Sequence, residues 1–159
     1  MSPVSPELMQ AIRQQYRLPW DGIHGVSHWA RVRETGLRLA TKTEASAAVV
    51  ELFAAFHDAC RLNEGRDPAH GRRGAELAAR LRGTLFTLPD ADFARLQEAC
   101  ILHTAGLLDG DATVQTCWDA DRLDLPRVGI AVDPARLCTA AAREPAILAW
   151  ASRRSLAGC

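Results

Sequence analysis

The chain has 159 residues, of which 48% are hydrophobic, and this suits one globular domain with a substantial core. Its 19 basic and 19 acidic residues cancel, so no overall field draws it to a nucleic-acid polymer or an anionic membrane. The five cysteines form no CxxC pair or even disulfide framework, and no apolar run resembles a signal peptide or a membrane span. We expect one cytoplasmic domain over residues 1–159 with reduced thiols.

The N-terminal part of the sequence predicts two helices with a loop between them. Ser5 is a suitable N-cap for a helix that ends near Tyr16. A glycine-containing loop follows and carries His24. Ser27 is a plausible N-cap for the second helix, which places His28 in its first turn.

The next two predicted helices each bring a histidine to the core. Residues 45–62 repeat apolar side chains every three or four positions, and His57 shares that stripe. Asp67 and the proline after it favour a helix start, and a helix from there to Arg82 places His70 near its N-terminus.

Two further helices are predicted between residues 89 and 125. In the helix that begins at Pro89, His103 lies on the apolar face before a glycine stop signal. In the helix over residues 112–125, Asp121 lies on the apolar face, and Asp119 is expected to be rotated away from it.

The C-terminal part of the chain predicts two short helices, over residues 134–142 and 145–156. The apolar stretch around Ile147, Leu148 and Trp150 packs either on the core or on a second copy in a homo-oligomer, and the sequence leaves both open. No convincing alternation typical of strands occurs, so the expected fold class is all-α.

Several histidines and carboxylates are predicted on apolar helix faces. Such groups are costly there unless they are hydrogen-bonded, paired or bound to metal. One inward histidine alone is more often a satisfied core residue, so the prediction depends on the whole series. Imidazole and carboxylate ligands without clustered thiolates favour an open catalytic metal site over a structural zinc site. The series comprises His24, His28, His57, Asp58, His70, His103 and Asp121.

Three segments carry a histidine, a His-Asp pair and a later aspartate: HGVSHWARV, FAAFHDACRLN and CWDADRLD. In this pattern the chain resembles the HD-domain superfamily of metal-dependent phosphohydrolases over about residues 20–130, with C-terminal helices over about residues 133–157. The resemblance implies a single helical HD domain with a metal site in the helix core. It implies His28, His57, Asp58 and Asp121 as ligands of one divalent ion.

Two more segments, DPAHGRRGAE and ILHTAG, resemble the two-metal members, such as bacterial HD-type diadenosine polyphosphate hydrolases and some cyclic dinucleotide phosphodiesterases. They imply His70 and His103 as ligands of a second ion, with Asp58 bridging. The alternative is that His70 caps its helix or binds phosphate, while His103 hydrogen-bonds within the site. Fe, Mn, Zn, Ni, Co and Mg all remain open as the metal.

The resemblance implies cleavage of a phosphate ester or anhydride in a small nucleotide or related metabolite by a metal-activated water, with His57 and Asp58 at the catalytic centre. Guanidinium groups match phosphate oxygens, and we expect Arg73 and Arg122 to bind the substrate phosphate. His24 is expected to contact substrate or to support a ligand, with a plain loop residue as the alternative.

Two other functions are compatible with the same residues. HD-type di-iron oxygenases use a similar six-ligand set on a polyol or phosphonate-like substrate, and tight iron with oxygen consumption would indicate that class. A noncatalytic regulatory domain would instead bind a metal or a nucleotide without turnover.

Overall fold

Helices build the fold over residues 1–158, the part of the chain that this computed structural model describes. Within these residues extended pairing is confined to one bridge between Arg82 and Phe86, and no helix is long and apolar enough to cross a membrane. The predicted all-α class is confirmed. The elements are α1 (Pro6–Gln15), α2 (Val26–Thr43), α3 (Ala47–Phe56), α4 (His70–Leu81), α5 (Asp90–Leu102), α6 (Ala112–Arg122), the short 3-10 helices η1 (Leu125–Val128) and η2 (Pro134–Arg136), and α7 (Pro145–Ala157).

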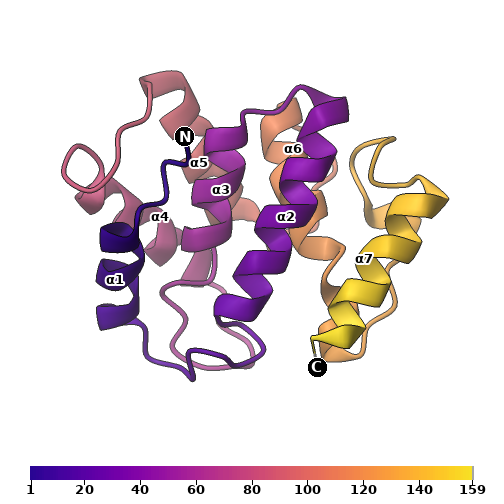
Figure 1. Ribbon diagram of the computed structural model, residues 1–159, viewed down its shortest axis with the longest axis horizontal. Coiled ribbons are helices and arrows are strands. Elements are labelled where there is room, and N and C mark those ends of the chain that lie inside the picture. The colour runs from indigo at the N-terminus through magenta and orange to yellow at the C-terminus, as the bar shows by residue number, and fades with distance from the viewer. Residues whose placement is uncertain (159) are drawn as a thin grey trace.

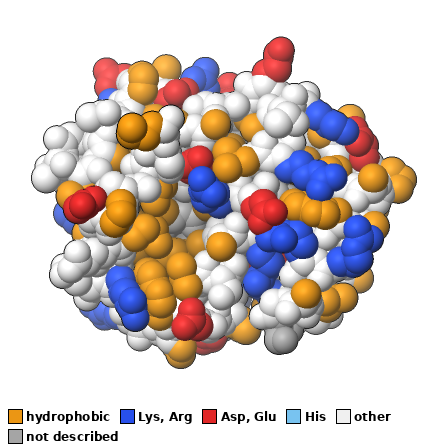
Figure 2. Space-filling model, viewed as in Figure 1, with side chains coloured by type: hydrophobic (Ala, Val, Ile, Leu, Met, Phe, Trp, Pro, Cys, Tyr) orange, Lys and Arg blue, Asp and Glu red, His pale blue; other side chains and the backbone are white. Residues whose placement is uncertain are grey.

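The helices form two layers with a helix at either end (Figure 1). α2 and α3 lie side by side, α4, α5 and α6 pack behind them, α1 contacts α3, and α7 contacts α2 and η1. Basic, acidic and hydrophobic side chains are interspersed over the face seen in Figure 2, where no histidine is visible. The histidines lie inside the helical layers.

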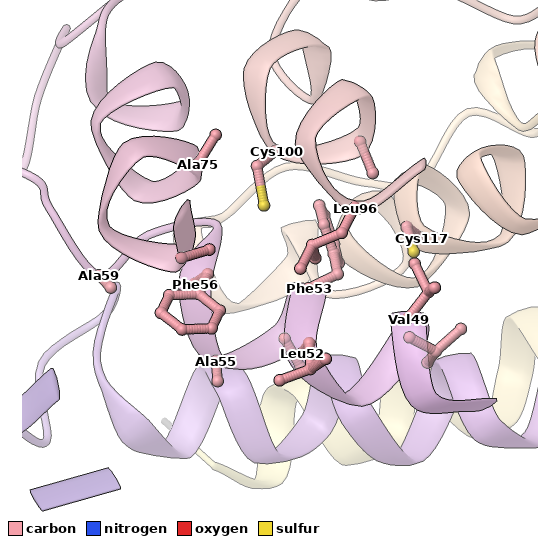
Figure 3. Packing of buried hydrophobic residues seen from close by; sticks show 14 of the residues in the cluster. Val49, Leu52, Phe53, Ala55, Phe56, Ala59, Ala75, Leu96, Cys100 and Cys117 are labelled. Carbon is pink, nitrogen blue, oxygen red and sulfur yellow. The ribbon is translucent and has the colours of Figure 1, made fainter. Parts of the chain in front are cut away.

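α3 is the central helix and is buried on every side. All its residues from Val49 to Phe56 are buried, and all of them except Glu51 are apolar, as expected for a helix in the core. Phe53 and Phe56 pack with Leu96 and Cys100 of α5 in the core drawn in Figure 3. The residues that follow α3 therefore begin in the middle of the molecule.

The sequence predicts that this helix continues to residue 62, but it ends at Phe56 and residues 57–60 form turns. At this end the ring of His57 folds back onto the helix and the backbone changes to tighter turns. Nδ1 of His57 lies 3.0 and 3.2 Å from the carbonyl oxygens of Phe53 and Ala54 in the last helical turn, and the next backbone bond, from the Ala59 N–H to Phe56 at 3.2 Å, is that of a turn. The early end aims His57 and Asp58 into the space between the two layers.

Two predicted helix starts are also corrected. α2 begins at Val26 with Gly25 as N-cap, because the chain turns back tightly enough for the Val26 N–H to donate to Trp20 at 2.8 Å. Ser27 therefore lies inside the helix and is not its cap. His28 keeps its predicted place in the first turn.

α4 begins at His70 rather than at Asp67. The Asp67 carboxylate does not cap the helix, because it accepts the Leu62 N–H at 2.8 Å and a guanidinium hydrogen of Arg73 at 2.6 Å. It closes the loop between α3 and α4.

Two glycines let α4 approach its neighbours closely. A Cβ on Gly71 would lie 2.1 Å from the backbone oxygen of Cys100 in α5, and one on Gly74 would lie 2.2 Å from the backbone oxygen of Phe56 in α3. Any side chain here would push α4 outward. The close packing brings His70 against His103 at the end of α5.

α6 is buried on two faces, and this overturns the prediction for Asp119. The carboxylate of Asp119 is 0% exposed. It accepts the backbone N–H groups of Cys138 and Thr139 at 2.7 and 2.9 Å. The chain after η2 covers this face, where turns replace the helix predicted to reach residue 142. Asp119 thus holds the C-terminal segment, while Asp121 faces the histidines.

The C-terminal helix α7 packs within the chain. Ile147 and Ala151 are buried in a second apolar cluster with Leu39 of α2 and Leu123 beyond α6. Leu148 and Trp150 are partly buried against it. Four cysteines, Cys60, Cys100, Cys117 and Cys138, are free thiols as predicted, and Cys159 lies outside the described residues.

Candidate metal centre

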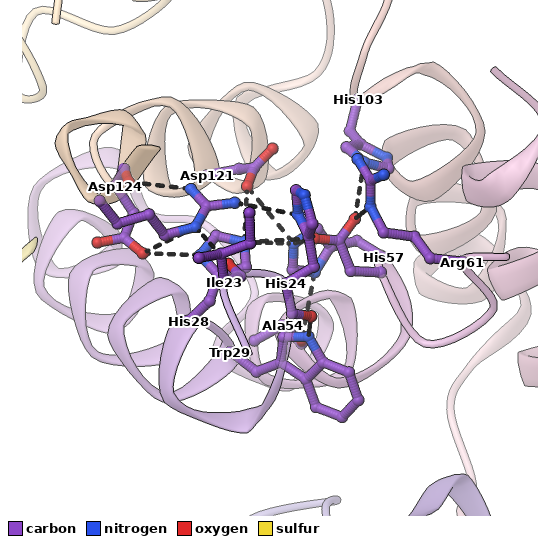
Figure 4. Close-up of polar contacts among 12 residues, drawn as sticks. Ile23, His24, His28, Trp29, Ala54, His57, Arg61, His103, Asp121 and Asp124 are labelled. Carbon is purple, nitrogen blue, oxygen red and sulfur yellow. Dashed lines mark hydrogen bonds and ion pairs between the residues drawn. The ribbon is translucent and has the colours of Figure 1, made fainter. Parts of the chain in front are cut away.

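His28, from the first turn of α2, and His57, at the end of α3, face each other in the core. Their Nε2 atoms lie 3.1 Å apart, and both side chains are fully buried. Oδ1 of Asp121 lies 3.2 Å from Nε2 of His28 and 3.4 Å from that of His57. Oδ2 of Asp58 lies 3.6 Å from each of them. Figure 4 shows His28, His57 and Asp121 turned toward one another.

The Nδ1 partners of these two histidines fix which nitrogen is free. Nδ1 of His57 lies 3.0 Å from the carbonyl oxygen of Phe53, and a carbonyl can only accept, so Nδ1 carries the proton. Nδ1 of His28 lies 2.7 Å from Oδ2 of Asp124, a carboxylate that orients the ring in the same sense. In the neutral rings, each Nε2 atom therefore carries a free lone pair.

A second group repeats the arrangement on the other side of Asp58. The Nε2 atoms of His70 and His103 lie 2.9 Å apart, and Oδ1 of Asp58 lies 3.0 and 3.6 Å from them. Nδ1 of His103 donates to the carbonyl of Cys100 at 2.7 Å, and Nδ1 of His70 donates to that of Asp67. In the neutral rings, these Nε2 atoms again carry free lone pairs.

Lone pairs and carboxylate oxygens that face one another repel, unless a proton or a metal ion lies between them. Nitrogen atoms this close can both reach one ion at the usual distance of about 2.0–2.1 Å. The ligand atoms of His28, His57 and Asp58 lie within 4.8 Å of one another, as do those of Asp58, His70 and His103. Each buried group could hold a metal ion.

The carboxylates of the site are held in their charged form. Burial by itself raises the pKa of Asp58, but in the metal-free site the positive charge of His57 and hydrogen bonds from His103, His24 and His70, when these rings are protonated, hold it well below its usual value. For Asp121, burial is likewise outweighed by His28 and His57, which hold its pKa well below its usual value. Both side chains are thus in the protonation state that binds metal.

His24 lies inside the site and not apart from it. Its Nδ1 is 3.3 Å from Oδ2 of Asp58, and its Nε2 is 3.1 Å from the backbone oxygen of Glu64. Hydrogen bonds to its own carbonyl from Tyr16 and Trp29, at 3.0 and 2.8 Å, fix the loop. This position suits the supporting role expected for His24, and a contact with substrate stays a prediction.

The two arginines expected to bind substrate phosphate hold other parts of the chain. Arg73 donates to the carbonyl of Cys60 at 3.0 Å and to Asp67 at 2.6 Å. Arg122 donates to the carbonyls of Leu107 and Arg136, at 2.7 and 2.8 Å. Neither contacts the metal-ligand candidates, and their role in substrate binding stays a prediction.

Three residues beyond the predicted ligands and phosphate-binding arginines also contact the site. Asp124 orients His28, Arg61 donates to Oδ1 of Asp58 at 3.2 Å, and Arg127 lies with its Nη2 3.4 Å from Nδ1 of His24. Asp124 follows Asp121 by three residues, roughly one helical turn on, and this spacing is the signal that could have identified it. Arg61 follows Asp58 at the same spacing.

A cavity of about 440 Å³ opens beside the second group. His103 forms part of its wall, and so do Arg122 and the apolar side chains of Leu125, Val132 and Leu137. A molecule in this cavity would contact one of the metal-ligand candidates.

The site brings together the six residues that sequence analysis selected as metal ligands, a geometry compatible with an HD-like centre. Their convergence comes from α2, α4, α6 and the ends of α3 and α5. Comparisons with protein-family models, with curated proteins and with solved structures gave no match to this chain.

Proposed function

We propose that the protein is a metal-dependent phosphohydrolase acting on a phosphate ester or anhydride of a small nucleotide or related metabolite. The observation that carries the proposal is the inward convergence of four imidazole Nε2 atoms, each with its Nδ1 anchored to an acceptor. In this proposal one divalent ion binds to the first group, which consists of His28, His57, Asp58 and Asp121. Another binds to the second group, which consists of Asp58, His70 and His103. The two oxygens of Asp58 face different groups, so its carboxylate would bridge the ions.

A divalent ion supplies hydrolytic chemistry by lowering the pKa of bound water from about 15.7 to roughly 7. The residues of the chain supply position and charge. Asp124 holds the ring of His28, while Arg61 and Arg127 add positive charge beside Asp58 and His24. Buried guanidinium groups next to the site suit an anionic substrate such as a phosphate ester.

The cavity beside His103 supports an organic substrate rather than free phosphate. Its volume of about 440 Å³ falls in the range of small-molecule sites. Apolar residues such as Leu125, Val132 and Leu137 line it together with Arg122. The proposal therefore places the organic group of the substrate in this cavity, with its phosphate toward Asp58.

The test is phosphate release from a panel of nucleotides, cyclic nucleotides and dinucleoside polyphosphates by chelator-treated protein, with each candidate metal added back. We expect turnover of at least one substrate only with metal. Asp58→Asn should lower kcat/KM by roughly 10²-fold or more, because the metal supplies several kcal/mol of transition-state stabilisation. Asp109→Asn, which removes the charge of an exposed side chain, is the matched control.

Two results of this experiment would reject the proposal. One is full turnover by a folded Asp58→Asn variant. The other is the absence of hydrolysis across the panel. In that second case, oxygen consumption by the iron-loaded protein would support the oxygenase alternative, and ligand binding without turnover would support a regulatory domain.

A further inference from the structure

A small pocket on the other side of the turn after α3 gathers arginines from three parts of the chain. Its volume is about 210 Å³. The wall comes from the end of α1, the turn that contains Cys60, and one face of α4. It shares no lining residue with the cavity beside His103. The residues that line it are Gln15, Arg17, Cys60, Arg61, Leu62, Arg73, Glu76 and Arg80.

The side chains that line this pocket carry more positive than negative charge. Four guanidinium groups line it against the single carboxylate of Glu76, although the chain as a whole has a formal net charge of zero. Arg61 and Arg73 have carboxylate partners, Asp58 and Asp67. Among residues 1–158, Arg17 and Arg80 form no salt bridge.

The turn at Cys60 connects Gln15 of α1 with Arg73 of α4. Arg73 donates to the backbone oxygen of Cys60 at 3.0 Å. The Cys60 side chain is partly buried and donates to Gln15 at 3.4 Å. Arg17 and Arg80 are exposed, so their guanidinium groups stay accessible to a ligand at this wall.

Arg17 and Arg80 leave positive charge in this wall beyond what its carboxylates neutralise. Guanidinium forks match the oxygens of phosphate in geometry and charge, and several of them around a concave surface concentrate anions there. The volume is below the range of about 300–1,000 Å³ for drug-sized ligands. It suits a phosphate or pyrophosphate group rather than a whole nucleotide.

We propose that this pocket, with Arg17 and Arg80 at its edge, is a binding site for a phosphate-bearing anion, separate from the metal centre. The proposal does not depend on the proposed function. Arg61 connects the two sites, because its Nε binds Asp58 and its Nη1 binds the backbone oxygens of Asn63 and Gly65. An anion in the pocket would lie against the guanidinium group that holds the carboxylate of the metal centre.

The test is calorimetric titration of metal-free full-length protein with inorganic pyrophosphate at low salt. Removing metal excludes binding of the anion to metal ions, and the arginine variants then separate the pocket from other basic positions. We expect saturable binding, and a loss of affinity of at least about tenfold in the double variant R17Q/R80Q, because each charge-assisted hydrogen bond contributes substantially. Both side chains are exposed, so the variant should fold, and its circular dichroism and melting temperature confirm this.

The matched control is R38Q/R153Q, which removes the same charge from two exposed positions outside both cavities and should bind as the wild type does. Absence of binding by the wild type, unchanged affinity in R17Q/R80Q, or an equal loss in the control would each overturn the proposal. A parallel titration with a nucleoside triphosphate identifies the source of the phosphate. Tighter binding than pyrophosphate indicates the tail of a larger ligand, and weaker binding indicates a free inorganic anion, and both support the site.

Discussion

His28 and Asp124 are joined by a buried hydrogen bond of 2.7 Å between Nδ1 and Oδ2. Asp124 also accepts from Arg31 at 2.8 Å, so the carboxylate is itself fixed. Burial acts to raise its pKa, but His28 and Arg31 outweigh burial and lower it. A charged Asp124 keeps the Nδ1 proton of His28 in place and directs Nε2 toward His57.

We predict that Asp124→Asn weakens metal binding while the protein stays folded. Partners that orient a metal-binding histidine typically contribute about 10- to 100-fold in affinity. Competition with a chromogenic chelator measures the change, with Asp109→Asn as an exposed control. An Asp124→Asn protein that binds metal as tightly as the wild type would show that this hydrogen bond does not support the site.

We predict that Gly74→Ala destabilises the protein by about 1–3 kcal/mol, the usual cost of overpacking. The new Cβ would meet the backbone oxygen of Phe56 at 2.2 Å, and a backbone atom cannot rotate away. Urea denaturation of the metal-free protein measures the free energy of unfolding. Gly65→Ala is the control, because its Cβ would meet only the side chain of Asn63 at 3.5 Å. Equal stability of both variants would contradict the close approach of α4 and α3.

The carboxylate of Asp111 leads to a prediction of how the stability of the fold depends on pH. Its carboxylate caps α6 by accepting the Thr113 N–H at 2.8 Å and pairs with Arg95 at 3.2 Å. Although burial raises its pKa, the hydrogen bonds from Thr113 and Arg95 lower it overall. Because the pKa is lowered in the folded protein, the charged carboxylate stabilises the fold at pH values above its pKa in the unfolded chain, about 3.9. This contribution is lost as the pH falls through the pKa in the folded protein.

Asp111→Ala should therefore lower the free energy of unfolding at pH 7 by about 0.5–2 kcal/mol, the range for loss of an N-cap. The difference from the wild type should shrink as pH falls below 4. Urea denaturation across this range measures it, with the exposed Asp109→Ala as control. A difference that stays constant down to pH 2 would argue against the charged cap.

Helical periodicity in the sequence predicts most of the helices and the inward direction of His57, because buried stripes repeat with the helix turn. It does not reveal that α6 is covered on two faces. Asp119 is buried by a segment about twenty residues later, and a single helix pattern contains no information about such a cover. Asp124 was missed for a related reason, since its partner His28 is 96 residues away.

The helix ends were predicted less well than the helices. Asp67 and Ser27 have the chemistry of N-caps, but tertiary contacts decide their use. Asp67 is taken by Arg73 and the Leu62 N–H, and the chain before Ser27 already turns into α2 at Gly25. Tertiary contacts also decide how the arginines are used. From the sequence alone, every guanidinium group near a metal-ligand candidate is equally suited to bind phosphate.

The metal content of the protein, measured by mass spectrometry after saturation with Zn²⁺ or Mn²⁺ and removal of unbound ions, tests the proposed two-ion centre most directly. We predict two ions per chain in the wild type, one in His103→Ala, which removes a donor of the second group alone, and none retained in Asp58→Asn, which faces both groups. Asp109→Asn should keep both ions. A folded wild-type protein that retains no ion, or an Asp58→Asn protein that retains two, would contradict the account.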